Sequence, residues 1–123
     1  MPTLHVVIPV YNEKGTLEQC VQRVFNSPLP AGWNIQITLV DHHSDAAQFP
    51  AVESLARRLI TEDMPLEFHR HEVNKGKGAA LQTGFDSVLA GGASDDDMVI
   101  IQDGDLEYDP NDYASLMQPI ING

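Results

Sequence analysis

The chain has 123 residues, which is enough for one domain with its own hydrophobic core. Eighteen acidic residues against seven basic ones give a formal net charge of -11, which argues against a nucleic-acid partner and is compatible with binding metal cations. The single cysteine, Cys20, excludes an internal disulfide, and no apolar run is long enough to cross a bilayer, so we expect a soluble, cytoplasmic chain.

Short apolar strands alternate with amphipathic helices along the sequence. Strands are predicted at four runs of apolar and β-branched residues: Leu4–Ile8, Ile35–Val40, Leu66–His71 and Met98–Gln102. A helix is predicted after each strand, where apolar residues recur at helical spacing: Leu17–Phe25, Val52–Ile60, Leu81–Leu89 and Tyr113–Ile121.

Prolines and capping residues predict where some of these elements begin and end. Pro9 is expected to stop the first strand, and Thr16 with Gln19 forms a capping box at the start of the first helix. Pro119 is expected to kink or end the last helix. The third helix is expected to bury an apolar stripe that consists of Leu81, Phe85, Val88 and Leu89.

The alternation of strands and helices predicts an α/β fold over residues 1–123 as a single domain. Strands of this kind form a doubly wound, mainly parallel sheet with helices on both faces, giving three α/β/α layers. Ligands of such sheets bind beyond the carboxyl ends of the strands. The polar segments that follow the predicted strands are therefore the candidate site: Pro9–Glu13, Asp41–Ser44, His71–Gly78 and Asp103–Glu107.

The segment Asp103-Gly104-Asp105 follows the last predicted strand and is a candidate metal site. Hard divalent cations prefer oxygen ligands, and Mg²⁺ is typically held by one or two carboxylates together with the phosphates of a substrate. Asp and Gly are also ordinary turn residues, so a solvated acidic turn is the alternative. The position directly after a buried strand favours the metal site.

The segment from Asn74 to Gly78 precedes the third predicted helix and is a candidate phosphate site. Lys75 and Lys77 supply positive charge, and Gly76 lets the backbone approach a ligand. The spacing is not that of a P-loop, and an ordinary helix start is the alternative.

Two further segments offer base and sugar contacts. Tyr11 has the chemistry to stack on a base, and Asn12 and Glu13 to bond a ribose or base, although a polar turn is the alternative. His42 and His43 are adjacent, and adjacent side chains rarely face one ion, so structural zinc is not expected.

The four segments together closely resemble the family 2 glycosyltransferases with the GT-A fold. The matching blocks are VVIPVYNEKGTLEQCVQRV, ITLVDHHSD, NKGKGAALQTGF and MVIIQDGDLEYDPNDY, which occur in family order and cover nearly the whole chain. Within the family they look most like the branch of dolichyl- and polyprenyl-phosphate sugar synthases. The resemblance implies a Rossmann-like site for a UDP- or GDP-linked sugar and a divalent cation, Mg²⁺ or Mn²⁺.

The resemblance also assigns roles to residues of this sequence. It implies that the donor nucleotide is bound by the following residues: Pro9, Tyr11, Asn12, Glu13, Asp41, His42, Lys75, Gly76, Lys77 and Asp103. It implies that Asp105 is the chief metal ligand, with Asp103 assisting. It places the general base of the reaction outside this chain.

Two departures from the family pattern bear on these expectations. Where the family usually has Asp-Asp-Gly, this chain has Asp41, His42 and His43, so the base preference is open, and His43 disfavours a positive φ. The chain also stops soon after the metal loop. We therefore expect a donor-binding half without the acceptor-binding half, which in a longer parent protein would act at the cytoplasmic face of a membrane.

The expected function is metal-dependent, inverting transfer of a sugar to an acceptor such as a polyprenyl phosphate. The alternative is a non-catalytic nucleotide-binding or assembly module, which would form a homodimer. A sugar-1-phosphate nucleotidyltransferase ranks lower, because Pro9–Glu13 lacks the glycine-rich signature of that class.

Overall fold

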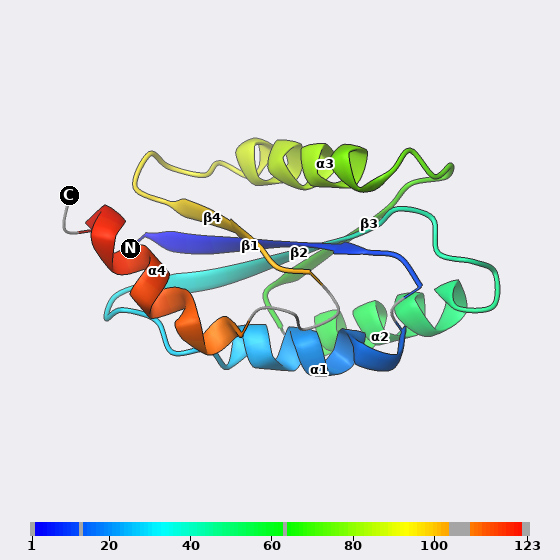
Figure 1. The fold of residues 1–123 in the computed structure, drawn as a ribbon, viewed down its shortest axis with the longest axis horizontal. Coiled ribbons are helices and arrows are strands. Elements are labelled where there is room, and N and C mark those ends of the chain that lie inside the picture. The colour runs from blue at the N-terminus through cyan, green and yellow to red at the C-terminus, as the bar shows by residue number, and fades with distance from the viewer. Residues whose placement is uncertain (1, 13, 63, 104–108, 122–123) are drawn as a thin grey trace.

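The computed structural model describes residues 2–12, 14–62, 64–103 and 109–121. Its elements follow the predicted order of alternating strands and helices (Figure 1). The strands are β1 (Thr3–Val10), β2 (Asn34–Asp41), β3 (Leu66–Arg70) and β4 (Met98–Ile101). The helices are α1 (Lys14–Phe25), α2 (Phe49–Thr61), α3 (Lys77–Ala90), the short 3-10 helix η1 (Pro110–Asp112) and α4 (Tyr113–Ile121).

The described strands form one parallel sheet in the order β3-β2-β1-β4. The chain runs outward from β1 through β2 to β3 and then returns across β1 to place β4 on the other side. Figure 1 shows α3 on one face of this sheet and α1, α2 and α4 on the other. The predicted three-layer, doubly wound α/β fold is confirmed.

The two faces of the sheet differ in polarity because alternate residues of a strand point to opposite faces. The face toward α1 and α2 is apolar, and Leu4, Val6 and Ile8 of β1 are fully buried there in the main core. The face toward α3 is more polar: beside apolar residues such as Val7 and Val40 it carries Thr3, His5, Gln36, Thr38, Glu67 and His69. Most of the apolar burial therefore lies on one side of the sheet.

Helix α3 lies close to the sheet through a glycine. A Cβ atom added to Gly84 would lie 2.4 Å from Cγ1 of Val7, so only glycine allows this approach. The buried residues of α3 are Ala80, Gly84 and Val88, whereas Leu89 is 71% exposed. Of the predicted stripe, Val88 is buried, Leu81 and Phe85 are half-buried, and only Leu89 is wrongly predicted, because the close approach to the sheet selects the face with small residues.

The ends predicted from prolines and the capping box can be compared with the structure. β1 continues through Pro9 to Val10. The C=O of Val7 accepts the N–H of Gln102 and therefore faces β4. Pro9, two residues further along the strand, faces the same side. Because the pairing of β1 with β4 ends at Val7, no hydrogen bond of the sheet requires an N–H from Pro9. α1 begins at Lys14, which places Thr16 inside the helix and not at its N-cap. α4 ends at Ile121, as the apolar pattern predicts, two residues and less than one turn past Pro119.

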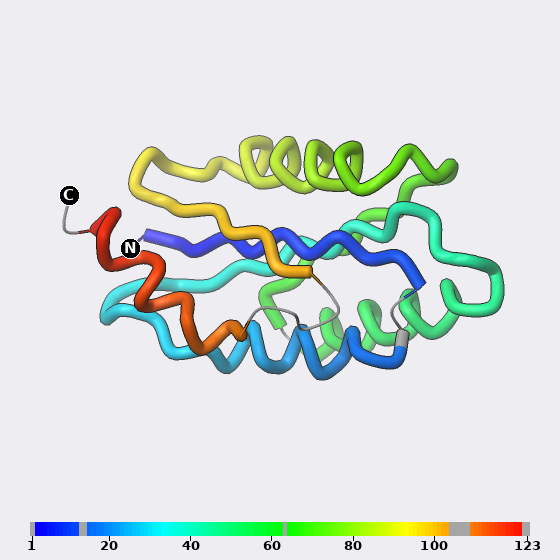
Figure 2. The backbone as a smooth tube through the Cα atoms, viewed as in Figure 1, coloured from blue at the N-terminus to red at the C-terminus, as the bar shows by residue number. Residues whose placement is uncertain are grey.

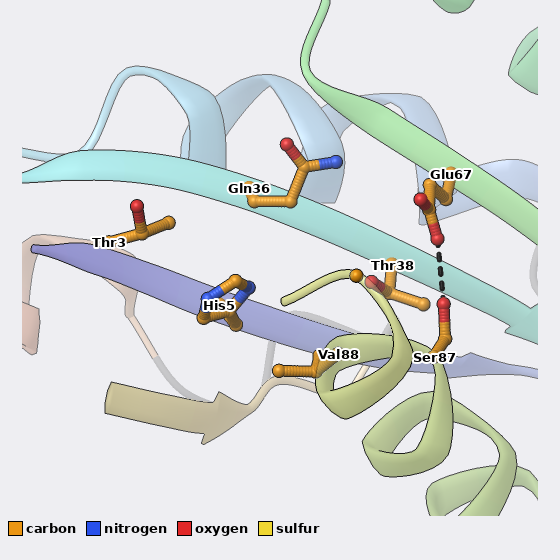
Figure 3. A pocket seen from close by; sticks show the side chains of 8 residues that line it. Thr3, His5, Gln36, Thr38, Glu67, Ser87 and Val88 are labelled. Carbon is orange, nitrogen blue, oxygen red and sulfur yellow. Dashed lines mark hydrogen bonds between the residues drawn. The ribbon is translucent and has the colours of Figure 1, made fainter. Parts of the chain in front are cut away.

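A polar cavity of about 230 Å³ lies under the C-terminal half of α3 (Figure 3). Its lining includes Thr3 and His5 at the start of β1, and Glu67, which accepts a hydrogen bond from Ser87 of α3 at 2.7 Å. It lies toward the amino ends of the strands, away from the predicted site. Within the described part of the chain, no helix is long and apolar enough to cross a membrane.

Candidate functional site

The carboxyl ends of the strands bring polar residues together at one end of the molecule. Figure 2 shows the loops after β1 and β2 and the segment leading into α3 at that end, opposite the two termini. The segments involved are Tyr11–Asn12 after β1, Asp41–Asp45 at the end of β2, Arg70–Lys77 after β3 and Asp103 after β4. The predicted convergence of these segments is confirmed for the described residues.

Asn12 ties the loop after β1 to the loop after β2. Its backbone N–H donates to Oγ of Ser44 at 2.9 Å. Its side-chain Oδ1 accepts the backbone N–H of Asp45 at 2.8 Å, and its Nδ2 donates to the Asp45 carboxylate at 3.1 Å. Asn12 has a φ of 53°, a left-handed conformation that asparagine tolerates better than most residues. The two loops are therefore held in a fixed relation.

Asp41 is the fully buried carboxylate at the centre of these contacts. It accepts hydrogen bonds from the backbone N–H and the hydroxyl of Ser44. Its other oxygen lies 3.4 Å from Nε of Arg70, whose guanidinium also donates to the C=O of Ser44 at 3.3 Å. A buried carboxylate needs such partners because the charged form is poorly solvated. In this structure Asp41 fixes the loop that follows it, and its predicted nucleotide contact stays a prediction.

Sequence reasoning missed Arg70. This side chain lies at the end of β3, in register with Asp41 on β2, and its guanidinium carbon lies 3.5 Å from the centre of the Phe49 ring. The sequence does show a basic residue at the end of a predicted strand. That this residue is the partner of Asp41, however, depends on the pairing of β2 with β3. That pairing is a long-range property that the local pattern of apolar residues does not specify.

His43 occupies a backbone conformation that favours glycine. Its φ is 88°, and its Nδ1 lies 3.3 Å from the C=O of His71. His43 was expected to disfavour a positive φ, but the loop keeps this conformation, which is strained for a residue with a Cβ. Nearby, Nε2 of His71 lies 2.7 Å from Oγ1 of Thr83 on α3.

Tyr11 and His42 form a stacked aromatic pair at the mouth of the site. Their ring centroids are 5.1 Å apart and their planes differ by 26°. Burial lowers the pKa of His42, against the opposing effects of its hydrogen bond with Asn74 and the charge of Asp41. His42 is therefore a neutral imidazole near pH 7, a form in which one ring nitrogen donates and the other accepts.

The predicted phosphate segment forms a tight turn into α3. The N-cap Gly76 has a φ of 88°, and its N–H donates to Oδ1 of Asn74 at 2.8 Å. Lys75 is exposed, and Lys77 is the first residue of α3. The turn thus places two lysines and the N-terminus of a helix at the site, an arrangement that attracts anions.

Asp103 and Lys77 form an ion pair between the last strand and α3. Nζ of Lys77 lies 2.5 Å from Oδ1 of Asp103. The backbone C=O of Asp103 accepts hydrogen bonds from Nε2 of Gln102 at 3.3 Å and from the thiol of Cys20 at 3.7 Å. Gln102 is itself held by the buried hydroxyl of Tyr113, which donates to its Oε1 at 2.6 Å. Burial and the neighbouring Cys20 raise the pKa of Tyr113, which keeps this hydroxyl a donor.

The donor chemistry at Asp103 fits a hard divalent cation, because it is a carboxylate at a polar strand end. Across residues 2–12, 14–62, 64–103 and 109–121, no group of three or more histidine, cysteine or acidic side chains is placed to hold a metal ion. Glu13 and Asp105, the predicted donor contact and chief metal ligand, lie outside the described residues. Pro9, by contrast, lies within β1 and pairs with Val40.

Comparison with known proteins identifies the family. A sequence model described as "Glycosyl transferase family 2" matches residues 5–123. The chain belongs to glycosyl transferase family 2. The resemblance noted from the four sequence blocks is thereby confirmed.

Relatives of this family 2 chain include sugar transferases that are named for polyprenyl phosphates. A dolichol-phosphate mannosyltransferase of Pyrococcus furiosus is 28% identical over 118 residues, which are 96% of this chain and 30% of the relative. An undecaprenyl-phosphate 4-deoxy-4-formamido-L-arabinose transferase of Pseudomonas aeruginosa is 30% identical over 118 residues, 96% of this chain and 32% of the relative. The family 2 chain thus spans about a third of the length of these relatives.

A solved structure supports the assignment of the fold. The mannosyltransferase PcManGT from Pyrobaculum calidifontis, solved with GDP-Man and Mn²⁺, matches with a TM-score of 0.68 at 23% identity. The match covers 90% of this family 2 chain and 30% of that structure. The described part of the chain therefore has the GT-A fold.

Proposed function

We propose that residues 1–123 form the donor-binding part of a metal-dependent glycosyltransferase. The donor is a nucleotide-diphospho-sugar linked to UDP or GDP, and the cation is Mg²⁺ or Mn²⁺. One observation carries this proposal, namely the convergence of four strand ends, where basic Lys77 and acidic Asp103 lie side by side. A diphosphate that is bound through a cation needs carboxylates for the cation and basic groups for the phosphate oxygens, close to each other.

The geometry supports a division of roles within the site. The aromatic pair of Tyr11 and His42 offers stacking and hydrogen-bonding groups to a base, and the Asn12 and Asp41 loops hold that pair in place. Lys75, Gly76 and Lys77 face the diphosphate. Asp103 and Asp105 are the proposed metal ligands.

The cation would stabilise the negative charge that develops on the departing nucleoside diphosphate, acting as a Lewis acid. The residues of this chain bind and orient the donor. The names of the relatives support a polyprenyl phosphate as the acceptor. The Mn²⁺ and GDP-Man in the structure of PcManGT support the choice of cation and donor class.

Calorimetric titration of the chain with UDP and with GDP tests the proposal, in the presence of Mn²⁺ and after chelation. We expect binding that requires the cation and that Asp105→Ala abolishes. Asp95→Ala is the matched control, because Asp95 is an exposed carboxylate in the turn before β4, away from the site. Binding that persists after chelation, or that both variants reduce equally, would contradict the metal-dependent donor site.

A further inference from the structure

The ion pair between Lys77 and Asp103 occupies the carboxylate at which the proposed function places a cation. Nζ of Lys77 donates to Oδ1 of Asp103 in a direct ammonium–carboxylate contact. The pair joins the first residue of α3 to the residue two positions after β4, so it links two of the segments that form the site. In the described structure, lysine thus supplies positive charge next to this acidic residue.

A divalent cation and an ammonium group compete for the same carboxylate. They repel each other strongly at a separation of a few ångströms, and repulsion between partly buried charges is only weakly screened by salt. Entry of a cation at Asp103 therefore weakens the ion pair with Lys77 and favours another partner for the ammonium group. A diphosphate on that cation would present oxygens within reach of the displaced ammonium, which would form charge-assisted hydrogen bonds with them.

The surroundings of the pair allow Lys77 to move while Asp103 stays in place. The Lys77 side chain is 52% exposed and the Asp103 side chain 23% exposed. The backbone of Asp103 is anchored through its C=O by Gln102 and Cys20. A flexible, half-exposed lysine stem costs little to reorient, in contrast to an anchored strand end.

We propose that Lys77 is an exchangeable counter-ion of the donor site. In the protein without ligand it neutralises Asp103, and when the cation and nucleotide enter it transfers to the diphosphate. This inference rests on the proposed function and adds that Lys77 has opposite effects on the two ligands. It competes with the cation when the nucleotide is absent, and it stabilises the nucleotide once the cation is bound.

The opposite effects can be measured with Lys77→Met, which keeps the length of the stem and removes the charge. Mn²⁺ binding without nucleotide is followed by the electron paramagnetic resonance signal of the free ion. UDP and GDP binding at saturating Mn²⁺ is followed by calorimetry. We expect Lys77→Met to bind Mn²⁺ about two- to fivefold more tightly, the range for a partly exposed ion pair, and the nucleotide about tenfold more weakly.

Three further variants separate this exchange from general effects. Arg57→Met removes one positive charge from a side chain that is 75% exposed on α2, so both affinities should stay unchanged. Lys77→Arg keeps the charge and should restore affinities close to those of the wild type. Adding Asp103→Asn to Lys77→Met should remove the gain in Mn²⁺ affinity, because that gain depends on the freed carboxylate.

The outcomes distinguish this inference from the function on which it rests. If the wild type binds nucleotide with Mn²⁺ but Lys77→Met leaves Mn²⁺ affinity unchanged, or weakens both ligands alike, the exchange is refuted and the donor site stands. If the wild type binds neither nucleotide with Mn²⁺, the proposed function fails and the exchange fails with it. Circular dichroism of each variant checks that the fold is retained.

Discussion

Arg70 is predicted to stabilise the fold of the site through the buried carboxylate of Asp41. Arg70→Met retains an apolar stem beside Phe49 and removes the guanidinium. The carboxylate of Asp41 is fully buried, so loss of its cationic partner leaves a charge in an environment where water cannot replace the missing contact.

The size of the effect follows from the geometry of the pair. Removing one partner of a fully buried ion pair costs about 3–5 kcal/mol. Here Arg70 is 32% exposed, and Ser44 still donates hydrogen bonds to the carboxylate, which reduces the loss. We therefore expect Arg70→Met to lower the free energy of unfolding by about 2 kcal/mol, in the range for hydrogen bonds to charged groups.

Urea denaturation followed by circular dichroism measures this change in a double-mutant cycle with Asp41→Asn. We expect a coupling free energy of about 1.5 kcal/mol between the two substitutions, because each removes the same interaction. Arg57→Met is the control, since its partner Glu53 is exposed and the loss should stay below about 0.5 kcal/mol. Equal effects of the two arginine substitutions, or additivity in the cycle, would refute the reasoning.

Three further predictions concern other parts of the fold. Gly84→Ala should lower the free energy of unfolding by about 1–2 kcal/mol in urea denaturation, because the new Cβ overlaps Val7. His43→Gly should raise the free energy of unfolding by about 0.5–1 kcal/mol in the same assay, because glycine accepts a φ of 88° without strain. Hydrogen bonds with His5 and with the N–H of Thr3 lower the pKa of Asp97 to about 2. The stability that Asp97 contributes relative to Asp97→Asn should therefore be full above about pH 4 and fall as the pH approaches 2, as urea titrations across that range would show.

For each of these three predictions, a control or a different outcome would contradict the physical reason given. Gly78→Ala, in the same helix as Gly84, adds a Cβ with nothing within 4 Å and should not destabilise the protein. If Gly78→Ala lowered the free energy of unfolding as much as Gly84→Ala, the overlap with Val7 would not be the cause of the destabilisation. A destabilising His43→Gly would mean that the contact with the His71 carbonyl outweighs the strain. If the difference in free energy of unfolding between wild type and Asp97→Asn did not vary with pH, the lowered pKa of Asp97 would be contradicted.

The strands and helices were predictable because their patterns are local. Alternation of apolar strands with amphipathic helices gave the element order, and the rule that ligands lie beyond strand ends located the site. Tyr11, His42 and Asp103 were singled out in this way, and they follow the carboxyl ends of β1, β2 and β4, while their roles stay predictions. The errors fell at element ends, such as Pro9, whose tolerance depends on where β4 stops pairing with β1.

Other features depend on contacts between distant segments and could not be read from the sequence. Arg70 acquires its partner only through the register of β2 and β3. The pairing of Lys77 with Asp103 joins residues 26 positions apart that were singled out for two different ligands. The buried face of α3 is set by the close approach at Gly84, whereas the pattern favoured the larger residues Leu81 and Leu89.

The unequal polarity of the two sheet faces has a consequence for motion. The layer formed by α1, α2 and the apolar face holds most of the hydrophobic core, whereas α3 rests on the more polar face and buries only Ala80, Gly84 and Val88. Local opening free energies follow buried apolar contact, so amide hydrogens of α3 should exchange with solvent through an opening that leaves β1 and β2 protected. Because Lys77 is the first residue of α3, such an opening would also move a charge of the site.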